Sequence, residues 1–302
     1  MFHTTPILTQ FRESTSMKRV CTARIRVMGW FIALILVAVL SASCGFTAHA
    51  TSAASVVTPS LPPPVSCPGC WHPALKVSWQ WQLQGTINQS LNVVMYDVDM
   101  FNTSASVVAS LHKAGHIVIC YIDAGTWESW RPDANKFPKS VKGNSVSGFS
   151  NERWLDIRQP SILDPIMKAR MDLCKSKGFN GVEFDNVDGY ANNTGFPLTA
   201  SEQLSYNVFL ANAAHTRGLP VALKNDLDQV TTLLPYFDWV LDEQCFQYQE
   251  CNKLVPFIKA NKAVMEVEYN LSTSQFCPKA NAMNFNSMKK YFSLDAYRVA
   301  CR

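Results

Sequence analysis

The sequence lacks the glycine-rich loops that cradle nucleotide phosphates. No apolar run is followed by G-x-G-x-x-G, which argues against a doubly wound dinucleotide-binding sheet. The pattern G-x-S-x-G of serine hydrolases is also missing. His112 and His215 fall on expected helices, and His116 begins an expected strand. Because no histidine stands where an apolar run ends, a Ser-His-Asp triad has no candidate base.

The sequence also lacks the signatures of a metal site and of a nucleic-acid-binding surface. Cys67, Cys70 and His72 form half of a zinc-binding pattern, but no second half exists, so a structural cystine is the better interpretation. No cofactor is implied. The chain has 27 Lys and Arg against 23 Asp and Glu, and residues 1–50 hold five of these bases and one of these acids. The remaining chain is therefore near neutral and has no basic stripe, which argues against a nucleic-acid partner.

The first 50 residues have the composition of a secretory signal peptide. Four basic residues lie within 18–26, a mainly apolar run spans 27–40, and Ala-His-Ala at 48–50 offers a cleavage site. The apolar run is short for a transmembrane helix, which needs about 20 residues. We expect a secreted protein without membrane contact after cleavage, with retention as a signal anchor as the alternative. Residues 51–66, rich in Ser, Thr, Ala and Pro, are expected to form a linker, and residues 67–302 a single domain.

Eight cysteines follow residue 50, and an even number in an exported chain favours disulfides. Cys245 and Cys251 flank a short loop and are expected to pair first, with Cys277 and Cys301 as a second pair. Cys120 lies within an apolar run and is interpreted as a free thiol in the core.

Short apolar runs alternate with helical segments along residues 67–302. Strands are expected at 79–85, 93–99, 116–123, 181–185, 221–226, 239–243, 264–269 and 296–301. Helices are expected at 104–114, 165–177, 201–217, 227–234 and 254–260, and a long loop at 126–150. This alternation is typical of a parallel α/β sheet covered by helices. Eight strands without a phosphate-binding loop favour a closed (β/α)8 barrel, the TIM barrel.

Six of the apolar runs end in acidic residues. These acids are Asp97 and Asp99, Asp123, Asp185, Asp226, Asp242 and Glu243, and Glu266 and Glu268. In a barrel the carboxyl ends of the strands meet at one edge, where active sites lie. One such acid is often a helix cap, but six acidic strand ends together predict a pocket lined by acids. Such a pocket suits a substrate with hydroxyl groups and positive charge.

Six short motifs mark the strand ends. They are WQWQLQG at 79–85, YDVD at 96–99, CYIDAG at 120–125, GVEFDNVD at 181–188, LKND at 223–226 and DEQCF at 242–246. Together and in this order they resemble glycoside hydrolase family 114, the endo-α-1,4-polygalactosaminidase family, from about residue 79 to residue 269. The resemblance implies a TIM barrel that cleaves α-1,4-linked galactosamine polymers from within. The expected partner is a cationic polysaccharide substrate, and we expect a monomer.

The resemblance also implies a catalytic pair. In that family the pair is an Asp after the fourth strand and a Glu after the sixth, and these positions fall on Asp185 and Glu243. Asp185 is then the expected nucleophile and Glu243 the expected acid and base, which requires carboxyl groups about 5 Å apart. Asp242 alternates to the other side of its strand and is interpreted as a structural acid.

The other residues at the strand ends are candidates for substrate binding. They are Trp81, Tyr96, Asp97, Asp99, Tyr121, Asp123, Lys224, Asp226 and Glu268. The acids suit sugar hydroxyls or an amine, and the aromatic rings suit stacking on a sugar face or a cation. Lys224 is expected to orient Asp185 and hold it ionised. The alternative for each of them is a structural role, in core packing or in an ion pair within the barrel.

Two other functions fit the same pattern. One is another retaining α-glycosidase, such as an α-galactosidase-like enzyme, because many such barrels carry acids after the fourth and sixth strands. The other is a carbohydrate-binding barrel without catalysis.

Overall fold

The computed structural model describes residues 60–302. The expected signal peptide and most of the expected linker therefore lie outside the described residues, and the domain boundaries stay a prediction. Within the described range, no helix is long and apolar enough to cross a membrane.

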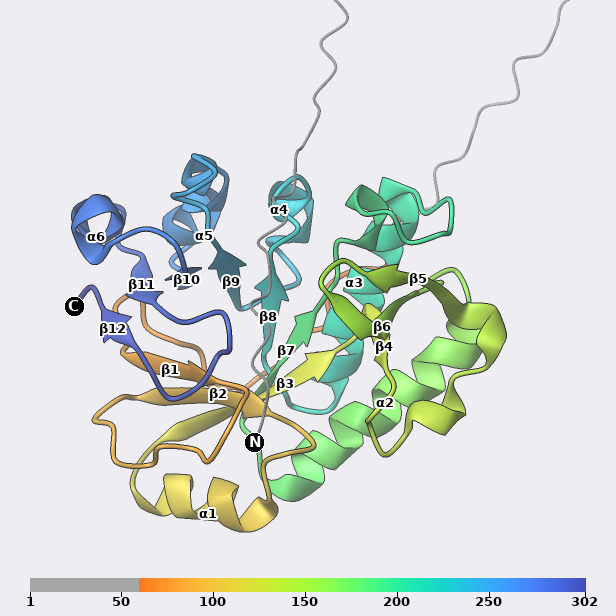
Figure 1. Ribbon diagram of the computed structural model, residues 1–302, viewed down its shortest axis with the longest axis horizontal. Helices are drawn as coiled ribbons and strands as arrows, with labels where there is room; N and C mark the ends of the chain where they lie inside the picture. Colours follow the sequence, from red (N-terminus) through yellow and green to blue (C-terminus); the bar gives the residue numbers. More distant parts are fainter. Residues whose placement is uncertain (1–59) are drawn as a thin grey trace, which may run out of the picture. The chain divides into compact units, whose positions relative to one another are not determined.

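The main sheet of this range has nine strands, of which eight are parallel to one another. Figure 1 shows how they are arranged. They are β1 (Trp79–Gln82), β2 (Met95–Asp99), β3 (Ile117–Asp123), β7 (Gly181–Asp185), β8 (Val221–Lys224), β9 (Trp239–Glu243), β10 (Val264–Glu268) and β11 (Asn286–Lys289). The sheet is curved, and its outer face is covered by α1 (Ala105–Lys113), α2 (Pro160–Lys177), α3 (Ala200–Thr216), α4 (Val230–Leu233), α5 (Val255–Lys259) and α6 (Thr273–Ala282). The prediction of a TIM-barrel fold is confirmed.

The eighth strand is not the one that the sequence predicts. We expected residues 296–301 to close the barrel, but β11 takes that place, and β12 (Val299–Ala300) pairs with it antiparallel. The sequence of β11 is NSMK, which is not an apolar run, so the pattern misses it. Asn286 links this strand to the start of β1. Its side chain bonds to the backbone of Leu75 and Val77, and its carbonyl oxygen accepts a bond from the indole of Trp79.

Alternation along the strands separates two cores. The barrel interior is filled by side chains such as Trp79, Trp81, Met95, Ile119, Tyr121, Trp239, Leu241, Met265 and Val267. Their neighbours along the strands, such as Val98, Val182 and Val240, belong to the core between sheet and helices. Because successive side chains of a strand point to opposite faces, a residue's place in this alternation decides whether it faces the pocket or the helices.

Four disulfides join cysteines of the described residues. They are Cys67–Cys70, Cys120–Cys174, Cys245–Cys251 and Cys277–Cys301. Three of these pairs are as expected, but the prediction of a free thiol at Cys120 is wrong. Cys120 alternates to the outer face of β3 and meets Cys174, which lies on the buried face of α2. The Cα atoms are 6.1 Å apart, within the usual span of a cystine.

The segment expected as a long loop forms a small antiparallel sheet. It contains β4 (Thr126–Glu128), β5 (Lys142–Val146) and β6 (Phe149–Leu155), in the order β4-β6-β5, with 3-10 turns at Ala134–Lys136 and Lys139–Val141. We call residues 126–155 the inserted sheet. Arg170 of α2 ties it to the barrel, because its guanidinium binds both Asp133 and the carbonyl oxygen of Asp123.

Gly125 lies where the ends of β3 and β7 approach each other most closely. The amides of Ala124 and Gly125 both donate to the carbonyl oxygen of Asp185 at 3.1 Å. A Cβ atom on Gly125 would lie 1.6 Å from the carbonyl oxygen of Asn186, a contact that only a backbone shift relieves. Glycine at position 125 therefore allows the backbone of residues 185 and 186 to pack directly against the end of β3.

We expect Gly125→Ala to lower the free energy of unfolding by about 3 kcal/mol, because the added methyl group forces two strand ends apart. Urea unfolding followed by circular dichroism measures this change. Gly189→Ala is the matched control, because the atom nearest to its added Cβ is a leucine methyl at 3.4 Å. Equal stability of the two variants would contradict the role given to Gly125.

Candidate active site

Two carboxylates and one ammonium group meet at the carboxyl ends of three adjacent strands. Asp185 ends β7, Lys224 ends β8 and Glu243 ends β9. Nζ of Lys224 lies 2.8 Å from Oδ1 of Asp185 and 2.7 Å from Oε2 of Glu243. Because both oxygens contact one nitrogen, the distance between them is at most the sum of these two distances, about 5.5 Å.

Exposure differs sharply within this group. The side chain of Lys224 is 1% exposed, whereas those of Asp185 and Glu243 are 17% and 23% exposed. Burial opposes the charge of Lys224, but the two carboxylates and Glu183 raise its pKa well above the usual value. The lysine is therefore a buried, charged anchor, and the two acids face the solvent side of it.

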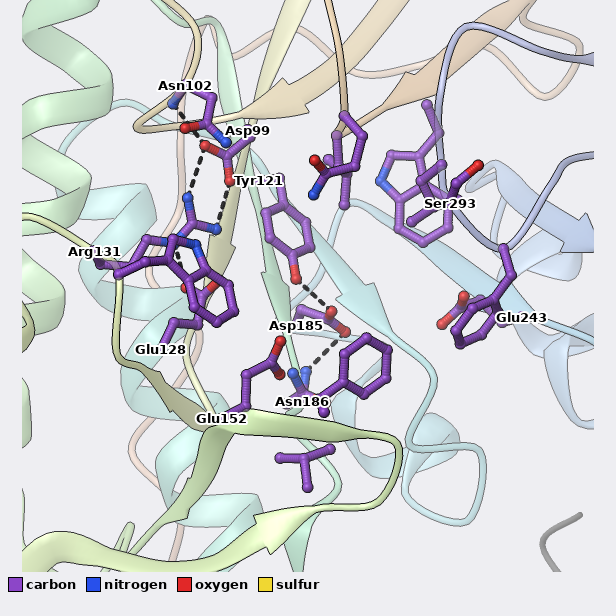
Figure 2. A pocket seen from close by; sticks show the side chains of 18 of the residues that line it. Asp99, Asn102, Tyr121, Glu128, Arg131, Glu152, Asp185, Asn186, Glu243 and Ser293 are labelled. Carbon is purple, nitrogen blue, oxygen red and sulfur yellow. Dashed lines mark hydrogen bonds and ion pairs between the residues drawn. The ribbon is translucent and has the colours of Figure 1, made fainter. Parts of the chain in front are cut away.

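Asp185 accepts hydrogen bonds on both oxygens. Besides Lys224, the hydroxyl of Tyr121 donates to Oδ2 at 2.6 Å, and the amide of Asn186 donates to Oδ1 at 2.8 Å (Figure 2). Burial acts to raise the pKa of Asp185, but Lys224 and these hydrogen bonds hold it below the usual value. The carboxylate is therefore ionised at neutral pH.

Glu243 is held by groups from its two neighbouring strands. The hydroxyl of Tyr269, just after β10, donates to Oε1, and Lys224 contacts Oε2. The backbone amide of Glu243 donates to the side chain of Asn225, which follows β8. Tyr269 is not among the binding residues predicted from the sequence, although it continues the inward alternation of Met265 and Val267.

The two acids open into a cavity of about 260 Å³. The strand ends contribute Trp81, Tyr121, Asp185, Glu243 and Tyr269, and the inserted sheet contributes Glu128, Trp130, Arg131, Val146, Phe149 and Glu152. The loop between β11 and β12 adds Phe292, Ser293 and Leu294. Within residues 60–302, no cluster of three or more His, Cys, Asp and Glu side chains is arranged to hold a metal ion.

Aromatic side chains form much of the cavity rim. Trp130, Phe149 and Phe292 are 52%, 42% and 65% exposed. The ring centroids of Phe149 and Phe292 are 6.0 Å apart, so the inserted sheet and the β11–β12 loop meet across the pocket. Exposed rings beside polar groups suit the apolar faces of sugar rings.

Five of the residues predicted from the sequence lie in or beside this cavity. They are Trp81, Asp99, Tyr121, Asp185 and Glu243, and Lys224 lies directly beneath the last two. The ring of Trp81 also covers Lys224, whose Nζ lies 5.2 Å from the ring centroid. The carboxylate of Asp99 forms an ion pair with the guanidinium group of Arg131, at 2.6 Å.

Three other predicted residues face outward, toward the helices. The hydroxyl of Tyr96 donates to the carbonyl oxygens of Asn88 and Leu91. Asp226 accepts from Asn207 of α3. Glu268 accepts from two backbone amides, those of Phe246 and Gln247. None of these three lines the cavity.

Two predicted acids are buried beneath the cavity or beside it. Asp97 is fully buried in the barrel interior, and burial raises its pKa to about 7. Asp123 accepts from the amide and hydroxyl of Thr126 and from the side chain of Asn186. Neither of these two acids lines the cavity.

The chain resembles known glycoside hydrolases over its whole described length. Residues 62–302 match the sequence model of glycoside-hydrolase family GH114. The chain is similar to the crystal structure of Aspergillus fumigatus Ega3 in complex with galactosamine, with 35% identity, a TM-score of 0.75, and coverage of 79% of this chain and 99% of that chain. The glycoside hydrolase domain of PelA from Pseudomonas aeruginosa shares the fold, with 12% identity, a TM-score of 0.60, and coverage of 76% and 99%. No curated protein matches the chain.

We expect Lys224→Met to raise the pKa of Asp185, because the substitution removes the ammonium group that favours the ionised carboxylate. Titration of carboxyl carbons by ¹³C NMR measures the shift. Lys253→Met is the matched control, since Lys253 pairs with Asp228 on the surface, and it should leave Asp185 unchanged. An unaltered titration of Asp185 in Lys224→Met would show that the hydrogen bonds alone set its pKa.

Proposed function

The chain belongs to glycoside-hydrolase family GH114 and is a glycoside hydrolase similar to the endo-α-1,4-polygalactosaminidases; on this premise we propose that it cleaves internal α-1,4-galactosaminidic bonds of a cationic galactosaminoglycan. Cleavage proceeds with retention of configuration, through the pair Asp185 and Glu243. The observation that carries the proposal is the single ammonium group of Lys224 in contact with both carboxylates.

The separation of the two acids supports retention. A retaining enzyme places its carboxyl groups about 5–5.5 Å apart, so that one attacks the sugar directly. An inverting enzyme leaves about 6.5–9.5 Å for a water molecule. The contacts of Lys224, at 2.8 and 2.7 Å, keep the bridged oxygens of Asp185 and Glu243 at most about 5.5 Å apart, below the separation of an inverting enzyme.

In the first half of the reaction Asp185 attacks the anomeric carbon. As this bond forms, the bond between that carbon and the glycosidic oxygen breaks, and Glu243 gives its proton to the departing oxygen. The contacts of Asp185 with Lys224, Tyr121 and the amide of Asn186 keep its carboxylate ionised and oriented for this step.

In the second half Glu243 acts as a base. It takes a proton from water while the water oxygen bonds to the anomeric carbon and the bond to Asp185 breaks. Glu243 is thereby protonated again, and the product keeps the α configuration. Tyr269 and Lys224 fix the position of the Glu243 carboxyl group in both halves.

The cavity walls support an amino sugar as the substrate. Five acids line the cavity, which favours a cation, and exposed aromatic rings stand at its rim. The related Aspergillus fumigatus protein was crystallised with galactosamine. Cleavage inside the polymer rests on the resemblance to the family.

The place of action is outside the producing cell. The sequence of residues 1–50 has the features of a signal peptide. The four disulfides of the described residues suit an oxidising compartment. The enzyme acts there as a monomer, without a cofactor.

We expect Asp185→Asn and Glu243→Gln each to lower the turnover of partly deacetylated α-1,4-galactosaminoglycan by at least about 10²–10⁴-fold, because each removes one of the two reacting carboxyl groups. New reducing ends and the masses of the released oligosaccharides measure turnover. Proton NMR of the first products, taken before the anomers interconvert, should show the α-anomer.

Asp242→Asn is the matched control for these variants. Asp242 is adjacent to Glu243 in β9, faces away from the cavity and is 1% exposed. Its pKa is raised well above the usual value, chiefly by burial, so the neutral amide is a close substitute and activity should persist. Release of the β-anomer first would replace retention by inversion. A folded parent that releases no oligosaccharide from this polymer would overturn the proposed substrate.

A further inference from the structure

The acids that line the cavity differ in whether a positively charged side chain of the protein contacts them. Asp99 and Glu128 each contact Arg131 at 2.6 Å. Asp185 and Glu243 share the ammonium group of Lys224. Among residues 60–302, Glu152 has neither a hydrogen-bond partner nor an ion-pair partner, although it lines the same cavity.

Glu152 reaches the cavity because of its place in the inserted sheet. It lies in β6 directly opposite Glu128 of β4, and the two side chains lie on the same face of this sheet. Figure 2 shows the carboxyl group of Glu152 directed toward the space beside Asp185. Arg131 forms its ion pairs with Glu128 and Asp99 and acts on Glu152 only at longer range, so Glu152 has no ion-pair partner of its own.

The surroundings of Glu152 disfavour its charge as long as the cavity holds no cation. Burial raises its pKa to about 7, and the charges of Glu128 and Asp185 act in the same direction, while the charge of Arg131 offsets them only in part. The pKa of Asp185 is not raised in this way, because the ammonium group of Lys224 lies beside its carboxylate. A cation that entered the cavity next to Asp185 would therefore find a carboxyl group without a partner.

The proposed reaction places a nitrogen atom at this point. The anomeric carbon must approach Asp185, and in galactosamine the amine is on C2, the carbon adjacent to the anomeric one. On the β8 side of Asp185 stands the ammonium group of Lys224, which would repel a second ammonium group. The inserted sheet, with Glu152, forms the cavity wall that offers an unmatched negative group.

Resting on the proposed function, we infer that Glu152 is the residue that determines specificity for a free amine, by pairing with the C2 ammonium group of the sugar attacked by Asp185. The unit at the cleaved bond must then be deacetylated. An acetamide group carries no charge and leaves Glu152 without its partner. The chemistry therefore belongs to the barrel strands, and the choice between free and acetylated amine belongs to the inserted sheet.

Two oligosaccharides of equal length test this inference, one of α-1,4-linked galactosamine and one of α-1,4-linked N-acetylgalactosamine. We expect the parent to prefer the free amine. Glu152→Gln should lower kcat/KM for the free-amine oligosaccharide by about 10- to 100-fold, the loss of one charge-assisted hydrogen bond. The rate with the acetylated oligosaccharide should stay as it is. Binding of galactosamine and N-acetylgalactosamine monosaccharides, followed by NMR, should show the same change.

Two further variants separate this role from a general effect of charge or folding. Asp172→Asn removes one negative charge from a surface pair with Arg217, where the Asp172 side chain is 61% exposed, and should leave the preference unchanged. Glu152→Asp keeps the charge on a shorter side chain and should restore part of the preference.

The outcomes distinguish this inference from the function on which it rests. If the parent cleaves the free-amine oligosaccharide and Glu152→Gln leaves the preference for it unchanged, Glu152 does not bind the C2 ammonium group. The proposed function then still stands. The same holds if the parent cleaves both oligosaccharides equally. If the parent cleaves neither one, both the inference and the proposed substrate are overturned.

Discussion

The ammonium group of Lys224 is the contact on which the rest of the site depends. Two carboxylates at the ends of strands on either side of β8 repel each other, and a charge removed from water costs several kcal/mol unless it is paired. The side chain of Lys224 is 1% exposed, and its ammonium group contacts both Asp185 and Glu243. The ammonium group therefore offsets the repulsion between the two carboxylates, and they in turn pair its buried charge. Its position at the end of β8, between β7 and β9, follows from the parallel register of these three strands. The barrel therefore sets the distance between these two acids.

The walls of the cavity come from parts outside the barrel strands. The inserted sheet supplies Glu128, Trp130, Arg131, Phe149 and Glu152, and the loop after β11 supplies Phe292. Arg170 anchors the inserted sheet to the end of β3 by bonds to Asp133 and to the backbone of Asp123. Contact between Phe149 and Phe292 then joins the two walls across the pocket. A site divided in this way can change its substrate preference through the walls while the reacting acids stay in place.

Alternation along the strands explains which of the residues predicted from the sequence line the cavity and which do not. Asp185 and Glu243 lie at inward positions, and so does Tyr121. Tyr96 and Glu268 stand one residue away from inward positions and face the helices. From the sequence we chose Glu268 because it is an acid at a strand end, whereas its neighbour Tyr269 is the residue that contacts Glu243. Because Val267 faces inward, alternation places Glu268 outward and Tyr269 inward.

Local pattern in the sequence determined the order of the first seven barrel strands and of the helices between them, the barrel class and the acids at the strand ends, because these follow from short-range periodicity and composition. The motifs at the strand ends also pointed to the family. Only the tertiary structure decided that Cys120 pairs with Cys174, that NSMK forms the eighth strand, and that Glu152 stands beside Asp185. These three depend on contacts between segments far apart in the chain, with energies set by packing, register and burial. No local pattern of residues encodes such contacts, and for that reason the sequence located the acids at the strand ends but not the wall that surrounds them.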